Sequence, residues 1–146
     1  MDFMVCNRSA IHDFKADVPY VIISITEPQD FHPQINITDQ NLIDALRIKF
    51  PDADRNYEYN GKIIEVMTEK DAEHILLFVS SVMHKIKLIV CQCDGGISRS
   101  SAVAAALGKI LNNDDTFIFN NLKYKPNMHV YRTILSYYFV QKNIEI

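Results

Sequence analysis

The feature that most constrains the fold is a short apolar segment that leads into a glycine pair and then into an alanine-rich segment. Residues 86–92 (IKLIVCQ) are apolar and rich in β-branched side chains, which predicts a buried central strand. Residues 99–111 (RSSAVAAALGKIL) have the composition of a helix. Gly95 and Gly96, two of the four glycines in the chain, lie between these segments. Glycines permit a tight turn there, because they adopt backbone conformations that side chains forbid.

Other segments of the chain also have strand patterns. Two are short, apolar and bounded by polar residues or proline, and a third alternates apolar with charged side chains up to Pro51. These predicted strands are 3–6, 20–26 and 45–50. Residues 51–67 are polar, and we expect them to be irregular apart from a short piece, IIEVM, at their end.

Helix signals follow the predicted strands. Thr68 begins T-E-K-D, a relative of the capping box, and apolar residues follow at helical spacing. Asp114 or Asp115 is expected to begin a short helix, and Pro126 stands where a last helix begins. Alternating strands and helices predict an α/β fold with a largely parallel sheet. We expect a single domain over residues 1–146.

Charge and composition narrow the classes of function. The net charge is −3 and the isoelectric point about 5.9, so the chain lacks the basic character expected of a nucleic-acid-binding protein. No run of 18 apolar residues predicts a membrane span, and the N-terminus does not resemble a secretory signal. Three cysteines without such a signal favour reduced thiols and a cytoplasmic location.

The chemistry is expected in the loop C-D-G-G-I-S-R-S, residues 93–100. A glycine loop at this position can aim successive backbone N–H groups at one point, and the following helix adds its own unpaired N–H groups. Cys93 lies in the same positive field, which favours a thiolate. Arg99 can bind two oxygens of one phosphate through its planar guanidinium. These residues predict a cradle for a tetrahedral oxyanion with a nucleophile at its base.

The pattern C-x-x-G-x-x-R-S, formed by Cys93, Gly96, Arg99 and Ser100, resembles the CX5R signature loop of the cysteine-based protein tyrosine phosphatase superfamily. The likeness is to the compact dual-specificity and bacterial or phage branch. It implies the phosphatase fold, with a mostly parallel sheet of about four or five strands flanked by helices. It also implies hydrolysis of a phosphomonoester, most plainly phosphotyrosine, without metal or organic cofactor.

The same resemblance assigns roles to residues of this chain. Cys93 would be the nucleophile that forms a phosphocysteine, and Ser100 would steady its thiolate. Arg99 would bind the phosphoryl oxygens together with the rest of the loop. The expected phosphate-binding residues are Asp94, Gly95, Gly96, Ile97, Ser98 and Arg99.

The family also uses an acid that protonates the leaving oxygen. The sequence F-P-D at 50–52 follows a predicted strand and resembles the acid loop of the family, so Asp52 is the first candidate. Asp54 is the alternative. Asp71 is a third candidate, although an acid in the first turn of a helix has a structural explanation.

Two departures from the family pattern support an alternative function. Gln92 stands where the family has a histidine, and Asp94 places a negative charge beside Cys93. Both disfavour the thiolate. The alternative is therefore a catalytically weak phosphate-binding module.

The expected partner is a phosphorylated protein or a small phosphomonoester, with neither a nucleic acid nor a membrane. The sequence leaves open phosphoserine, phosphothreonine or RNA 5′-phosphate as the substrate, and the oligomeric state.

Overall fold

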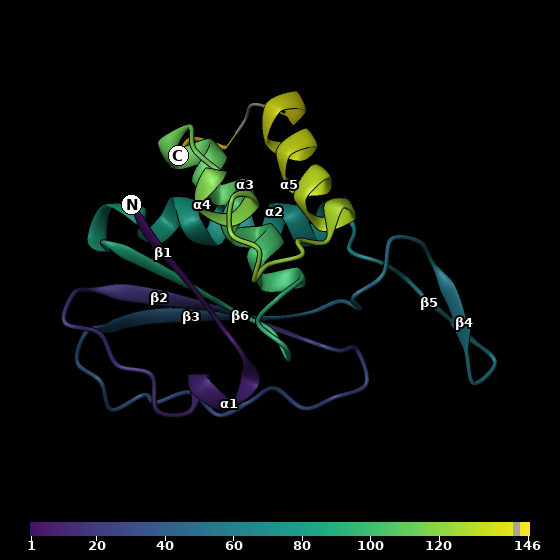
Figure 1. Ribbon diagram of the computed structural model, residues 1–146, viewed down its shortest axis with the longest axis horizontal. Coiled ribbons are helices and arrows are strands. Elements are labelled where there is room, and N and C mark those ends of the chain that lie inside the picture. Colours follow the sequence, from purple (N-terminus) through teal and green to yellow (C-terminus); the bar gives the residue numbers. More distant parts are fainter. Residues whose placement is uncertain (142–143) are drawn as a thin grey trace.

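A four-stranded parallel sheet forms the centre of the computed structural model, which describes residues 1–141 and 144–146 (Figure 1). The order of its strands is β1-β6-β2-β3, and every neighbouring pair runs parallel. The strands are β1 (Asp2–Cys6), β2 (Tyr20–Thr26), β3 (Leu42–Lys49) and β6 (Leu88–Gln92). The predicted α/β fold with a parallel central sheet is confirmed.

Burial along the strands follows from their place in the sheet. Every residue of the two central strands, β2 and β6, is buried, because both of their faces are covered. The edge strand β3 alternates near its end, where Ile48 is buried between the exposed Arg47 and Lys49. Phe50, just beyond this strand, is also buried. The continuous apolar runs at 20–26 and 86–92 thus marked the central strands, and alternation marked the edge strand β3. The apolar run at 3–6 also predicts a buried strand, but it lies in the other edge strand, β1, in which no residue is fully buried.

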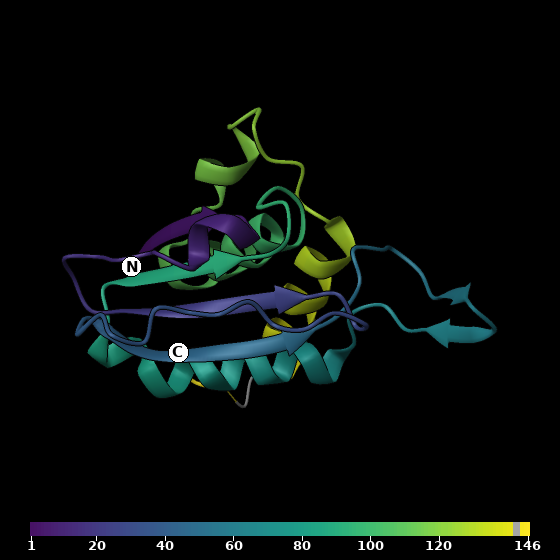
Figure 2. The ribbon, with the colours of Figure 1, turned by 90° about the horizontal axis from the view of Figure 1, so that it is seen from below.

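Three helices of the same length cover one face of the sheet: α2 (Glu69–Val82), α3 (Arg99–Asn112) and α5 (Met128–Gln141). The opposite face carries the short helix α1 (Arg8–Ile11) and the loop between β2 and β3 (Figures 1 and 2). The remaining helical pieces are η1 (Met83–Lys85) and α4 (Thr116–Phe119). Within the described residues, no helix is both long and apolar enough to cross a membrane.

The central helix α3 is apolar on nearly all sides because it is packed between the sheet and α5. Residues 99–108 are all buried. Five of them are alanine or glycine, and small side chains allow the helix to approach both layers closely. The first turn of this helix is therefore held firmly behind the loop that precedes it.

The expectation of irregular structure over most of residues 51–67 holds for residues 51–56 and 65–67 but is wrong for residues 57–64. The segment contains an antiparallel hairpin, β4 (Tyr57–Tyr59) and β5 (Lys62–Ile64), which extends away from the body of the molecule (Figures 1 and 2). Its turn residues, Asn60 and Gly61, have φ angles of 51° and 75°. An Asn-Gly pair favours this left-handed turn, so the dipeptide was a signal that could have predicted the hairpin.

The C-terminal ends of the parallel strands all lie at the same end of the sheet. Figure 2 shows the arrowheads of β2, β3 and β6 pointing to one side. The loops after β1, β2, β3 and β6 therefore meet, although they begin at positions 7, 27, 50 and 93. Ligands of open α/β sheets bind at this C-terminal end of the strands.

We expect Thr68→Ala to lower the free energy of unfolding by about 1 kcal/mol, the usual effect of losing an N-cap side chain. The Thr68 hydroxyl accepts a hydrogen bond from the Asp71 backbone N–H at 3.3 Å, and the Asp71 carboxylate accepts one from the Thr68 N–H at 2.9 Å. Urea denaturation followed by circular dichroism measures the change. Thr68→Ser, which keeps the hydroxyl, is the control; equal losses in both variants would contradict the capping role.

Candidate active site

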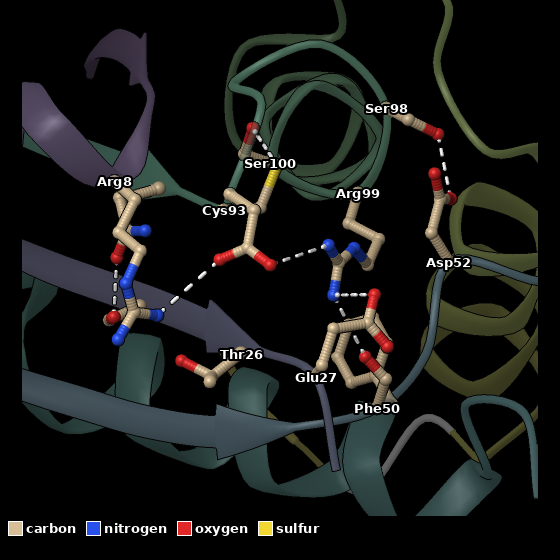
Figure 3. A network of polar contacts seen from close by, with 12 residues as sticks. Arg8, Thr26, Glu27, Phe50, Asp52, Cys93, Ser98, Arg99 and Ser100 are labelled. Atoms are coloured by element: carbon tan, nitrogen blue, oxygen red, sulfur yellow. Dashed lines mark hydrogen bonds and ion pairs between the residues drawn. The ribbon is translucent and has the colours of Figure 1, made fainter. Parts of the chain in front are cut away.

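The loop between β6 and α3 surrounds the thiol of Cys93 (Figure 3). Only 2% of the Cys93 surface is exposed. Its Sγ lies 3.1 Å from the hydroxyl of Ser100, which comes from the first turn of α3 and is itself buried. A hydroxyl in this position can donate a hydrogen bond to a thiolate.

Neighbouring segments bind the carbonyl groups of the loop from outside. The carbonyl of Asp94 accepts from the Arg8 N–H at 3.1 Å. Those of Ile97 and Ser98 accept from the N–H groups of Lys125 and Asn127, at 3.1 and 3.0 Å. Within residues 1–141 and 144–146, none of the backbone N–H groups of residues 94–98 has a protein acceptor. The loop thus turns its carbonyls outward and keeps its donors for another partner, as in other anion-binding loops.

Gly96 is required where the loop crosses the end of β1. Its φ is +65°, and a Cβ atom there would lie 2.7 Å from the Cys6 carbonyl carbon and 2.8 Å from the Asn7 nitrogen. Both are backbone atoms and cannot move aside cheaply. Gly95 has ordinary φ and no atom within 4 Å of such a Cβ. Of the two adjacent glycines, only Gly96 therefore occupies a position where the packing requires a residue without a Cβ atom.

Arg99 lies almost fully buried, at 5% exposure, beside the loop. Its Nη1 donates to the Phe50 carbonyl at 3.2 Å and lies 3.1 Å from the Glu27 carboxylate. Its Nη2 lies 3.7 Å from Asp94. The buried Nε has no acceptor among the described residues. A buried donor without an acceptor is costly, so this atom fits an oxygen of a bound anion.

A second arginine contacts the loop and was not expected from the sequence. Arg8, at the start of α1, lies 3.4 Å from the Asp94 carboxylate and donates to the Phe31 carbonyl (Figure 3). Asp94 therefore bridges Arg8 and Arg99. Part of the negative charge that Asp94 brings to the loop is offset in this way.

The structure brings one of the three candidate acids to the loop. Asp52 accepts a hydrogen bond from the Ser98 hydroxyl at 2.8 Å (Figure 3). The Asp54 side chain is 72% exposed and pairs with Arg55. The Asp71 carboxylate is used in the helix cap with Thr68.

Asn127 is a further site residue that the sequence did not reveal. Its side-chain amide donates to the Asp52 carboxylate at 2.9 Å and to the Ala53 carbonyl at 3.1 Å. Two residues later, His129 contacts the Met67 carbonyl at 2.8 Å. The start of α5 thus fixes both ends of the segment that carries the hairpin. No spacing in the sequence links positions 52 and 127, which are 75 residues apart.

Gln92 and Cys91, which precede Cys93 in the chain, are buried, and Cys6 at the end of β1 is partly buried. Gln92 accepts a hydrogen bond from the Ser24 hydroxyl, while its buried Nε2 has no acceptor in the described part of the chain. Burial raises the pKa of the Cys6 thiol to about 11, with a contribution from Cys93, and burial also raises the pKa of Cys91. Those two thiols are therefore protonated at neutral pH.

No group of three or more His, Cys, Asp or Glu side chains among the described residues is placed to hold a metal ion. The groups that are present are the backbone N–H groups of residues 94–98, the Arg99 guanidinium and the Cys93 thiol, all from one loop and the first turn of α3. Such an arrangement can bind a tetrahedral oxyanion and place it against sulfur.

No protein-family model matches the sequence, and no curated protein is similar enough to it to count as a relative. Solved structures do match the fold. Human DUSP28 has a TM-score of 0.59 at 14% identity, over 96% of this chain and 93% of that one. The human tyrosine phosphatase-like serine/threonine/tyrosine-interacting protein has a TM-score of 0.57 at 18% identity, over 85% and 79%. A mouse putative dual specificity phosphatase complexed with zinc tungstate has a TM-score of 0.54 at 14% identity, over 84% and 72%.

These likenesses show that the chain has the fold of the tyrosine and dual-specificity phosphatases, as the resemblance of its sequence motif predicted.

We expect Gly96→Ala to destabilise the protein by roughly 1–3 kcal/mol, because the substitution forces a residue with a side chain into a strained backbone conformation against β1. Affinity for tungstate should fall as the loop shifts. Thermal unfolding and isothermal titration calorimetry measure the two effects. Gly95→Ala is the matched control, and comparable damage in that variant would contradict the packing argument.

Proposed function

We propose that this chain hydrolyses phosphomonoesters, foremost phosphotyrosine in proteins, through a phosphocysteine intermediate and without a metal. The observation that carries the proposal is the set of unpartnered donors around Cys93. The N–H groups of residues 94–98 and the buried Nε of Arg99 are without protein acceptors in the part of the chain that the structure describes. A phosphoryl group offers several acceptor oxygens and an electrophilic centre that these donors would hold above the thiolate. The shared phosphatase fold supports the same reaction.

In the first step, the Cys93 thiolate attacks phosphorus. The S–P bond forms and the P–O bond to the leaving group breaks, while Asp52 donates its proton to the leaving oxygen. The Ser98 and Asn127 contacts hold one oxygen of the Asp52 carboxyl group, which leaves the other oxygen for the proton.

In the second step, water attacks the phosphocysteine. Asp52 takes a proton from that water, the new P–O bond forms and the S–P bond breaks, releasing inorganic phosphate. The Ser100 hydroxyl, 3.1 Å from Sγ, donates a hydrogen bond to the departing thiolate. Arg99 and the loop N–H groups stabilise the charge on the equatorial oxygens in both steps.

The charges around the loop favour a substrate with a single phosphoryl group. Asp94 and Glu27 both face Arg99, and Asp52 lies on the other side of the loop. These carboxylates would repel a second phosphate placed close to the first. We therefore propose a phosphorylated protein side chain or a small phosphomonoester, met in the cytoplasm, as the substrate.

A phosphate-binding module with little turnover is the second candidate. The observation that favours it is Gln92, which stands in place of the histidine of the family and keeps a buried Nε2 without an acceptor among the described residues. Such a module would use the same donors to bind a phosphate group without hydrolysing it.

We expect the protein to hydrolyse para-nitrophenyl phosphate in the presence of EDTA, with inhibition by vanadate. Cys93→Ser should lower kcat by more than about a thousandfold, because the nucleophile is removed. The variant should still bind tungstate, since the loop donors remain. Turnover at pH 5 to 8 and calorimetric binding measure the two properties. Substantial activity in Cys93→Ser would rule out the proposed mechanism, while tungstate binding without wild-type turnover would support the binding module.

We expect Asp52→Asn to lower kcat for phenyl phosphate by roughly 10²–10⁴-fold, the usual contribution of a general acid. Asp54→Asn, an exposed change on the same segment, should stay within a fewfold of the wild type. Steady-state kinetics of the two variants side by side make the comparison. The reverse order would assign the acid to Asp54.

A further inference from the structure

Two cationic side chains near the end of the edge strand β3 are left without partners by the fold. Arg47 and Lys49 are both exposed. Neither of them forms an ion pair with any residue in the described part of the chain. A single solvated lysine or arginine is ordinary on a protein surface. The direction in which these two side chains point, and what lies beside them, therefore decides whether they have a use.

Both side chains point to the face of the sheet that carries α1. Successive side chains of a strand point to opposite faces, so Ala45, Arg47 and Lys49 share one face. Ala45 packs in the smaller apolar cluster, which includes Ile11 of α1. Ile48, between the two cations, is instead buried in the larger cluster on the side of α2. Arg47 and Lys49 thus lie on the face that the three long helices do not cover.

Lys49 also lies next to the candidate active site. It pairs with Thr26, the last residue of β2, at the C-terminal end of the sheet. The next residue, Phe50, accepts a hydrogen bond at its carbonyl from Nη1 of Arg99, at 3.2 Å. One residue therefore separates a free surface cation from a residue that contacts the candidate phosphate-binding arginine.

Arg8 brings a third cation to the same face. The hydroxyl of Thr26 lies 3.1 Å from Nδ1 of His32, and Arg8 donates to the carbonyl of the preceding residue, Phe31. The loop after β2 therefore contacts Arg8 next to the residue that contacts the partner of Lys49. Burial lowers the pKa of His32, and the three cations lower it further, as expected for an imidazole with positive charges around it.

We refer to Arg8, Arg47 and Lys49 as the basic cluster. Figure 3 shows Arg8 on the side of Cys93 away from Asp52, so the cluster and the candidate acid flank the loop on different sides. The net charge of the chain is −3, and three unlike segments nevertheless bring cations together here. A local excess of positive charge on a chain that is acidic as a whole can attract and orient an anionic partner.

We propose that the basic cluster binds carboxylate side chains of a phosphorylated protein, beside the residue whose phosphoryl group enters the loop. The proposal rests on the function proposed above and narrows its substrates to phosphoproteins with acidic residues near the phosphorylated one. Aspartate and glutamate side chains are complementary in charge to the cluster. A nucleic acid fits less well, because it carries a charge at every phosphate and would bring further phosphates close to Glu27 and Asp94.

The test is the double variant Arg47→Gln/Lys49→Gln, which removes two charges outside the catalytic machinery. Lys85→Gln/Lys87→Gln is the matched control, because its two lysines have the same spacing, are also exposed, and precede β6 at the opposite end of the sheet. The substrates are two phosphotyrosine peptides of equal length, one flanked by glutamates and one by glutamines. Para-nitrophenyl phosphate, which has no flanking residues, reports the basal activity.

We expect the Arg47→Gln/Lys49→Gln change to lower kcat/KM for the glutamate peptide about three- to tenfold through KM, the usual effect of losing two exposed ion pairs. The glutamine peptide and para-nitrophenyl phosphate should stay within about twofold of the wild type, and added salt should reduce the preference for glutamate. Equal losses for both peptides, no loss with the glutamate peptide, or the same loss in the control variant would overturn the proposal.

Peptide binding separates failure of this proposal from failure of the proposed function. Fluorescence anisotropy of the two labelled peptides is measured with Cys93→Ser, alone and combined with Arg47→Gln/Lys49→Gln. The glutamate peptide should bind more tightly than the glutamine peptide only when the cluster is intact, whether or not the wild type turns over. Such binding without wild-type turnover would overturn only the hydrolysis. Wild-type turnover with equal kcat/KM for both peptides would overturn only the docking.

Reversing the charges tests the same contact in the opposite direction. Arg47→Glu/Lys49→Glu should prefer a phosphotyrosine peptide flanked by lysines over one flanked by glutamates, because the sign of the surface has changed. An unchanged preference would contradict the proposal. A 5′-phosphorylated oligoribonucleotide is the last substrate. A greater loss with it than with the glutamate peptide in Arg47→Gln/Lys49→Gln would assign the cluster to nucleic acid and overturn the proposal.

Discussion

The buried guanidinium of Arg99 is the group on which the rest of the site depends. A charge at 5% exposure must be compensated by close partners, and the molecule supplies them from three segments: Glu27 after β2, Phe50 after β3, and Asp94 in the loop. These contacts use Nη1 and Nη2 and leave Nε without a protein acceptor among the described residues. One arginine thus holds strand ends together and still has a donor to offer a ligand.

This arrangement is possible because of the parallel sheet. The C-terminal ends of parallel strands lie at one end of the sheet, so residues 27, 50 and 93 meet although the chain between them is long. The small side chains of α3 let its first turn lie close behind the loop, where Ser100 reaches Cys93. The outward hydrogen bonds of the loop carbonyls, to Arg8, Lys125 and Asn127, then fix the direction of its N–H groups.

The sequence predicts much of this fold because its strongest signals are local. The continuous apolar runs of β2 and β6, the cap at Thr68 and the C-x-x-G-x-x-R-S pattern each depend on neighbouring residues. Glu27, Arg8 and Asn127 could not be found in this way, since their contacts join segments 23 to 86 residues apart that only the tertiary fold brings together. The hairpin is a different case, because its Asn-Gly turn is itself a local signal in the sequence.

The hairpin is anchored at its base by hydrogen bonds. The Asn56 side chain accepts from the Val66 N–H at 3.0 Å, while Asn127 and His129 of the segment that begins α5 hold Ala53 and Met67 on either side of it. What lies between these anchors can be lengthened, shortened or exchanged at a small entropic cost, because the anchors, not the hairpin, set the path of the flanking chain. The fold therefore carries an arm whose length and sequence can change while the strand ends and the start of α5 that frame the candidate site keep their places, so the hairpin is a part of the molecule that can diverge freely.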